Sequence, residues 1–287
     1  MTASPDASNS LETSDSAEEK GSSPPVPELR RVGSDVPFYV ALGLLGGFYI
    51  FMILALIYAN LVYATPDSIL EALNTRELRY SILLSLVSCS ITALISVWVA
   101  VPIGYLMSRR TFPLKSLIDA ILDIPIVLPP LVIGLSLLIL FQTPLFKPVD
   151  ITFEIPIVIL AQFMVACAFS VRTMRVTFDQ ISPRCEQVAL TLGCTQSQAF
   201  WLVVFPEARR GVLAAGTIAW ARSLGEFGPL LIFSGATRMK TEVLSTAIYL
   251  EMSLGNITGA VAVSLLMIVI AVVALLLTRS FGLSLRG

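Results

Sequence analysis

Two charged residues, Arg222 and Glu226, lie four positions apart in a stretch that is otherwise almost entirely apolar. Residues four apart share one face of a helix, so their side chains can form an ion pair. Charged side chains at membrane depth are costly and normally face a protein interior or a cavity. Two interpretations stay open: a mutually neutralised pair that orients the helix, or a pair that lines or gates an anion pathway. Because Glu226 repels anions unless Arg222 dominates, the pair alone does not define a binding site.

Glycines and prolines in the same part of the chain are further pathway candidates. Gly225 and Gly228 lie on either side of Glu226 and would let a neighbouring backbone approach closely. A preceding apolar segment contains three prolines, which remove helix hydrogen bonds and kink a helix. Such kinks occur beside transport pathways, where free backbone groups can line a cavity, but a plain packing kink is equally compatible with the pattern. These prolines are Pro125, Pro129 and Pro130.

Several residue types and motifs that commonly support catalysis are missing from the sequence. It has no histidine, which removes the commonest metal ligand and the commonest proton shuttle at neutral pH. It has no GxxxxGK[ST] motif to hold ATP, and its four cysteines show no CxxC spacing. We therefore expect no catalytic residue, no metal site and no cofactor bound by this chain, and an enzyme is not expected.

The composition is that of a membrane protein. Of 287 residues, 55% are hydrophobic and only 14% are charged, and the mean hydropathy is +0.82. Soluble domains usually carry about a quarter charged residues. The net charge of −1 gives no basic field to attract nucleic acid. Residues 1–35 are rich in Ser, Pro and Glu without apolar periodicity, which predicts a disordered tail ahead of a membrane domain at 36–287.

Six apolar segments are each long enough to cross a hydrocarbon core of about 30 Å. All should be helices, because lipid offers no partners for unpaired backbone groups. With a cytoplasmic N-terminus, the inside segments collect thirteen Lys and Arg residues and the outside loops five, so we expect both termini in the cytoplasm. The predicted spans are approximately 36–64, 78–108, 117–141, 151–171, 212–234 and 257–277.

The longest cytoplasmic loop, at 182–206, contains signals for two short helices. Ser182 and Pro183 form a helix start, and Gly193 supplies a left-handed residue that ends the first helix. Thr195-x-x-Gln198 is a capping box that opens a second helix, which Pro206 should terminate. The apolar face of this pair could bury itself in the groove of a partner protein or lie flat on the lipid surface.

The loop resembles the EAA motif of ABC-importer permeases, in which a Glu-Ala-Ala triplet precedes a glycine and a later Ile-x-Leu-Pro. Gln187 replaces the motif's glutamate, although Glu186 is adjacent, and Phe205 replaces its leucine. In that family the loop is a coupling helix that docks into a cleft of a cytoplasmic ATPase subunit. The resemblance therefore favours docking over a lipid-bound segment, and implies an ATPase-coupling loop made of Glu186, Gln187, Val188, Ala189, Gly193, Val203, Phe205 and Pro206.

Two further stretches narrow the resemblance to one group of permeases. "LDIPIVLPPLVIGLSLLILF" (122–141) and "WARSLGEFGPLLIFSG" (220–235) are similar to the third and fifth spans of molybdate permeases. Sulfate permeases have a close relative of the second stretch, usually with Tyr at the position of Phe227. The chain is thus identified as a type I ABC importer permease of the molybdate/tungstate/sulfate group, with an all-α fold of six transmembrane helices.

The resemblance also implies the molecule's partners and location. We expect an oxyanion substrate, with molybdate or tungstate favoured, cytoplasmic ATPase subunits that bind ATP and Mg, and an external oxyanion-binding protein. Pairing with a second copy is expected in a lipid-embedded complex of a bacterial or archaeal inner membrane. The alternatives are a sulfate or other small-anion permease, which could pair with a second, related permease, an ion-coupled secondary transporter, and a non-transporting membrane scaffold.

Overall fold

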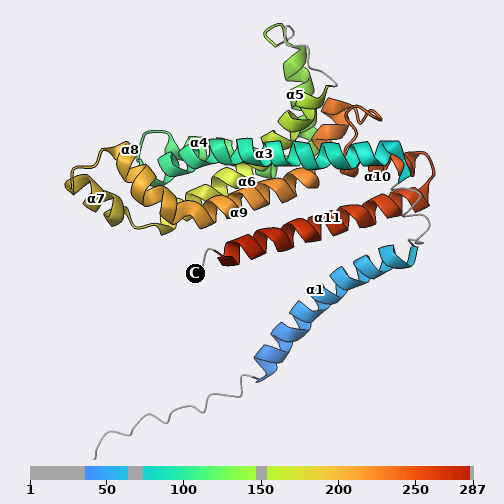
Figure 1. The fold of residues 1–287 in the computed structure, drawn as a ribbon, viewed down its shortest axis with the longest axis horizontal. Coiled ribbons are helices and arrows are strands. Elements are labelled where there is room, and N and C mark those ends of the chain that lie inside the picture. Colours follow the sequence, from blue (N-terminus) through green and yellow to red (C-terminus); the bar gives the residue numbers. More distant parts are fainter. Residues whose placement is uncertain (1–35, 64–73, 147–153, 285–287) are drawn as a thin grey trace, which may run out of the picture. The chain divides into compact units, whose positions relative to one another are not determined.

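The computed structural model of the protein describes residues 36–63, 74–146 and 154–284, with side chains up to residue 276. The regular elements within these ranges are helices, as the apolar segments predict (Figure 1). The predicted disordered tail, 1–35, lies outside the described residues. The chain divides into two units, 1–50 and 51–287. Helix α1 (Val36–Tyr63) runs through this division and is described by itself as a 28-residue apolar helix.

Three helices form the centre of the second unit. α3 (Arg76–Arg109), α6 (Ile155–Gln180) and α9 (Phe205–Leu224) pack against one another, and Figure 1 shows them side by side. Small residues permit this packing, because helices in lipid associate by close backbone approach. At Gly104 of α3, an added Cβ would lie 2.8 Å from the Met174 Cβ of α6. The buried core between these helices is correspondingly rich in alanine and serine.

The segment predicted as the third span is broken rather than kinked. α4 (Lys115–Val127) and α5 (Pro130–Gln142) are short helices that meet at an angle of 108°. Consecutive prolines at 129 and 130 remove two backbone donors, and a residue before proline avoids the helical region. Leu128 is accordingly extended, with φ −66° and ψ 140°. The prolines therefore produce the sharp bend of the chain between α4 and α5.

The segment predicted as the fifth span is also discontinuous. α9 ends at Leu224, a turn follows, and a short π-helix, η2 (Leu230–Ser234), continues the segment. α9 holds Glu207, Arg209, Arg210 and Arg222, so it is less apolar than the other long helices. α10 (Leu244–Ser253) and α11 (Ile257–Ser284) complete the fold and pack together.

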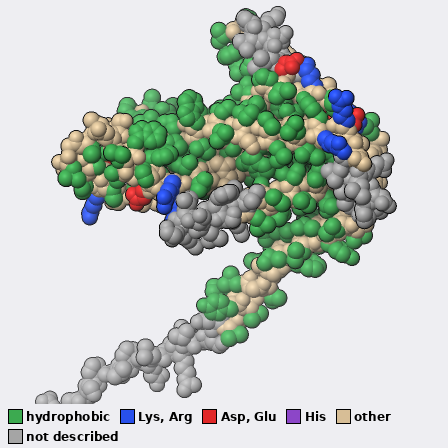
Figure 2. Space-filling model, viewed as in Figure 1, with side chains coloured by type: hydrophobic (Ala, Val, Ile, Leu, Met, Phe, Trp, Pro, Cys, Tyr) green, Lys and Arg blue, Asp and Glu red, His purple; other side chains and the backbone are tan. Residues whose placement is uncertain are grey.

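Four described helices are long and apolar enough to cross a membrane, and the bent pair α4–α5 is a fifth candidate. The four are α1, α3, α6 and the 257–276 part of α11. On the face drawn in Figure 2, apolar side chains cover the middle of the second unit, and the visible charged side chains gather toward its ends. This distribution suits a protein whose middle faces lipid.

Candidate functional site

The first helix of the predicted coupling loop starts and stops where the sequence signals lie. α7 (Pro183–Thr191) begins after Ser182, whose Oγ accepts a hydrogen bond from the Arg184 N–H at 3.4 Å. Its end is closed by Gly193, which has φ +93°, and by a hydrogen bond from Cys194 N–H to Ala189 O at 3.1 Å. The positive φ explains the glycine, since a side chain here would be strained.

The second helix begins as predicted but does not end at Pro206. Thr195 and Gln198 form both bonds of the capping box, at 2.9 and 3.3 Å, and open α8 (Gln196–Ala199). The chain then passes through a π-helical turn, η1 (Phe200–Val204), directly into α9. The prediction that Pro206 terminates the helix is wrong. The wider π turn precedes the proline, which lies in the first turn of α9, where its missing N–H and its ring are tolerated.

The loop exposes an apolar face that its own chain does not cover. Val188 of α7 and Leu192, which directly follows this helix, are 57% and 80% exposed. Gln187 beside them is also exposed, whereas Ala189 is buried against the rest of the unit. One side of this helix is thus packed against the rest of the unit, and the opposite side presents an exposed apolar pair. This arrangement is expected of a surface that docks into a groove.

Glu186 does not belong to this exposed face. Its carboxylate turns toward the end of α3, where Oε1 accepts a hydrogen bond from the Tyr105 hydroxyl at 2.5 Å. Oε2 lies 3.4 Å from the Arg109 Nε, and both side chains are nearly buried. Arg109 Nη2 also donates to the Ile181 carbonyl at 2.8 Å, next to the start of α7. Glu186 therefore fastens α7 to the membrane helices.

Tyr105 extends this attachment to two other elements. Its ring makes edge-on contacts with Phe178 of α6, at 5.6 Å between centroids, and with Phe200 of η1, at 4.8 Å. Of the remaining predicted loop residues, Val203 of η1 and Phe205 at the start of α9 are partly buried, and Pro206 is exposed. Displacement of the loop must consequently displace the ends of α3 and α6.

Arg222 and Glu226 form the predicted ion pair, although a helix end separates them. Arg222 Nη2 lies 3.5 Å from Glu226 Oε2. Glu226 is buried in the turn after α9, and its backbone carbonyl accepts a hydrogen bond from Ser245 Oγ at 2.7 Å. The Arg222 side chain is about one-third exposed, and its guanidinium lies 5.4 Å from the centre of the Phe169 ring. The pair thus has a buried acid and an accessible base.

Two of the proline and glycine candidates, Pro130 and Gly228, meet in the structure. An added Cβ at Gly228 would lie 3.0 Å from the Leu131 N and 3.1 Å from the Pro130 Cβ, so the start of α5 packs directly on this glycine. Gly225 is different, because an added Cβ would have only oxygen atoms of α9 near it, at 3.9 Å or more. Pro129 precedes α5 at the break and Pro125 lies within α4.

Sequence reasoning overlooked a buried polar cluster beside the Arg222–Glu226 pair. Gln162 of α6 donates from Nε2 to the Ser223 carbonyl at 3.3 Å, and its Oε1 accepts from the Thr92 hydroxyl at 3.2 Å. The cluster therefore links α3, α6 and the end of α9. A lone glutamine in an apolar run was the available signal, because a buried amide needs partners.

The comparison with protein families gives a match over residues 100–287, which is more than half of the chain. The matching family is described as the inner membrane component of binding-protein-dependent transport systems. The chain belongs to this family. The resemblance to ABC-importer permeases of the molybdate and sulfate group, and the helical permease fold, are thereby confirmed.

Individual relatives of this permease agree with the family. A molybdate/tungstate transport system permease protein, WtpB of Pyrococcus abyssi, is 33% identical over 202 residues, covering 70% of this chain and 74% of the relative. A sulfate transport system permease protein, CysT of Salmonella typhimurium, is 32% identical over 168 residues, covering 56% of this chain and 61% of the relative. The fold is similar to a bacterial alginate ABC transporter crystallised with its periplasmic protein, with a TM-score of 0.69 and 14% identity over 85% of this chain and 93% of that one.

Proposed function

We propose that this permease carries molybdate or tungstate into the cytoplasm as the membrane subunit of an ATP-driven importer. The observation that carries the proposal is the coupling loop, which is attached to α3 and α6 on one side and presents Val188 and Leu192 on the other. Such a loop transmits force between a docked partner and the membrane helices. The similarity to the WtpB permease supports the choice of anion.

In this proposal, a cytoplasmic ATPase subunit receives the exposed face of α7 and supplies the bound ATP and Mg. Closure of two ATPase subunits draws two loops together, and the Glu186–Tyr105–Arg109 contacts pass this movement to the membrane helices. Two copies of the chain form the pathway, both termini lie in the cytoplasm, and an external binding protein delivers the anion. The permease itself binds no cofactor and performs no bond chemistry.

The pathway is proposed to run beside Arg222. Its guanidinium is accessible, whereas the neighbouring Glu226 carboxylate is buried, so the positive charge is the one that an anion would meet. The adjoining contact of Gly228 with Pro130 is a place where α5 and the turn after α9 can move against each other. A barrier at this level would open and close as α3 and α6 shift.

Sulfate is the second candidate, because the CysT relative is nearly as similar over the part that it matches. Molybdate, tungstate and sulfate are all tetrahedral dianions, so the membrane pathway alone discriminates poorly between them. A sulfate permease of this type would pair with a second, related chain rather than with itself.

Uptake of radiolabelled molybdate tests the proposal. The chain would be expressed with its ATPase and binding protein in cells that lack their own molybdate permease, with and without excess sulfate. Molybdate uptake that sulfate hardly reduces supports the proposed substrate. Uptake abolished by sulfate would assign the chain to sulfate, and absence of uptake of both anions would contradict an oxyanion importer.

A further inference from the structure

A cavity of about 230 Å³ lies at the end of the second unit opposite to the coupling loop. Its lining comes from the beginning of α3, the turn before α10, α10 itself and the beginning of α11. α3 has 34 residues and is therefore about 50 Å long, with Arg109 of the coupling-loop attachment at its other end. The cavity and the coupling loop consequently lie at opposite ends of a helix that is long and apolar enough to cross a membrane. The polar side chains of the cavity are those of Thr75, Glu77, Arg238, Glu242, Glu251, Asn256 and Thr258.

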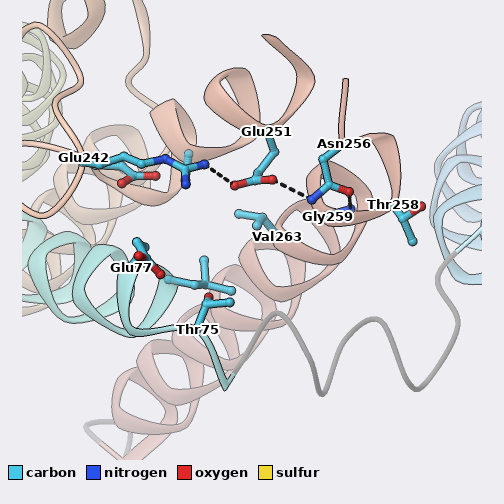
Figure 3. A pocket seen from close by; sticks show the side chains of 11 residues that line it. Thr75, Glu77, Glu242, Glu251, Asn256, Thr258, Gly259 and Val263 are labelled. Atoms are coloured by element: carbon cyan, nitrogen blue, oxygen red, sulfur yellow. Dashed lines mark hydrogen bonds and ion pairs between the residues drawn. The ribbon is translucent and has the colours of Figure 1, made fainter. Parts of the chain in front are cut away.

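One glutamate of the cavity has its hydrogen bonds satisfied within the chain. Glu251 Oε1 accepts from Arg238 Nη2 at 2.6 Å, and its Oε2 accepts from Asn256 Nδ2 at 2.7 Å. The Asn256 Oδ1 in turn accepts from the Gly259 N–H at 3.0 Å. Figure 3 shows this chain of contacts along one wall, with Glu77 set apart from it.

Glu242 is the unsatisfied group of the cavity. The residue is only 3% exposed, and its Oε2 has no hydrogen-bond partner among the described residues. A buried carboxylate oxygen without a donor is costly, so the site favours any donor that can enter. Glu77, Glu242 and Glu251 against Arg238 also give the lining a net charge of −2 when all four are ionised. The cavity therefore attracts a cation that carries N–H donors.

The size and ligand set favour an organic cation over a metal ion. Among the described residues, no group of three or more His, Cys, Asp or Glu side chains is placed to hold a metal. Calcium requires six to eight oxygen ligands, more than Glu77 and Glu242 can supply. A volume of about 230 Å³ also exceeds the roughly 30 Å³ share of one water, and leaves room for the end of a long side chain. The Arg238–Glu251 pair shows how this lining holds a guanidinium.

We propose that the cavity receives a lysine or arginine side chain of the external binding protein, with Glu242 and Glu77 as its acceptors. This inference rests on the proposed function, because a binding protein reaches the permease from the side opposite to the ATPase. The family is described as binding-protein-dependent. A buried charge pair of this kind adds a specific anchor to docking, since it is desolvated in the complex.

Binding of molybdate-loaded binding protein to the complete permease–ATPase complex in nanodiscs tests the inference. Glu242→Gln and Glu77→Gln are each expected to weaken binding about tenfold or more in 50 mM salt, with a smaller loss in 500 mM salt. Glu207→Gln, an exposed glutamate of α9 outside the cavity, is the matched control and should bind like the wild type. Retention of the ATPase subunit by every variant shows that the complexes are intact.

Three outcomes would overturn the inference. If both cavity variants bound the loaded protein with the affinity of the wild type, the cavity would not belong to the docking surface, and the proposed function would stand. Binding that requires added calcium and disappears with EDTA would identify a metal site instead. Failure of the wild-type complex to bind the loaded protein would contradict the proposed function, and the inference with it.

Discussion

The role of an individual carboxylate in this protein follows from the direction of its side chain rather than from its position in a sequence motif. Glu186 lies in the segment that resembles a docking motif, yet its side chain is bound by Tyr105 and Arg109 of its own chain. The neighbouring Gln187 is exposed. Glu186 is thus a positioning residue for the loop, and the groups available to a partner are those on the outer face of α7.

Replacing Glu186 with alanine is expected to loosen the loop. The change leaves the Tyr105 hydroxyl without its acceptor and the Arg109 guanidinium without its carboxylate partner, and should lower the free energy of unfolding by about 1–3 kcal/mol. Thermal unfolding in detergent measures this loss, and Gln187→Ala is the control that should leave the melting temperature unchanged. Equal melting temperatures for the two variants would show that the inward contacts contribute nothing.

The stability of the protein should depend on the ionisation of Glu242. Burial raises the pKa of this carboxyl, Arg238 opposes the shift, and the charges of Glu251 and Glu77 add to it. A raised pKa in the folded state means that folding favours the protonated form, so stability should fall as pH rises from the ordinary glutamate range to the raised pKa. Melting temperatures across this range should fall less in Glu242→Gln than in the wild type. An identical slope in the variant would contradict the assignment.

At the scale of elements, the breaks in the helices determine which helix ends can approach which turns. The prolines at 129 and 130 end α4, and the start of α5 then packs on Gly228 in the turn after α9. A continuous third helix could not place its middle against this turn. The break and the glycine are therefore two parts of the same contact.

Gly228→Ala is expected to damage this contact, whereas Gly225→Ala is not. The added methyl group at 228 would lie 3.0 Å from the Leu131 N, which requires a backbone shift and should cost about 1–3 kcal/mol. At 225 the nearest atoms are 3.9 Å away or more. Melting temperature and molybdate uptake should both fall for the first variant alone. Equal behaviour of the two variants would mean that α5 can move away at no cost.

At the scale of the whole molecule, the second unit presents different chemistry at the two ends of α3. One end carries the apolar face of α7 and the other the acidic cavity beside α10. An importer must contact an ATPase on one side of the membrane and a binding protein on the other. The long helix α3 contributes residues to both ends and is the element that connects them.

Leu192→Asp should prevent the ATPase subunit from co-purifying with the permease. The residue is 80% exposed at the C-terminal end of α7, and a charge placed in an apolar groove cannot be solvated there. Leu254→Asp is the control, because Leu254 is 66% exposed at the end of α10 beside the cavity. That variant should retain the ATPase. Retention by both variants would show that the outer face of α7 is not the docking surface.

The sequence by itself determined where the long apolar segments lie, the family, and much of the local shape of the coupling loop. Gly193 and the Thr195–Gln198 capping box were predictable because each acts on residues within four positions of itself. The continuity of the helix through Pro206 was not predictable, since it depends on a π turn whose Phe200 ring packs against Tyr105 of α3.

Only the tertiary structure decided the direction of Glu186, the contact between Gly228 and α5, and the cavity that joins Glu77 with Glu242. Each of these brings together residues that are far apart along the chain. Their meeting depends on the break at the prolines for Gly228, and on the packing of α3 against α6 and against α10 for the other two, which no local pattern encodes. Hydropathy specifies that a helix crosses the membrane, but packing specifies which side chains it presents to a partner.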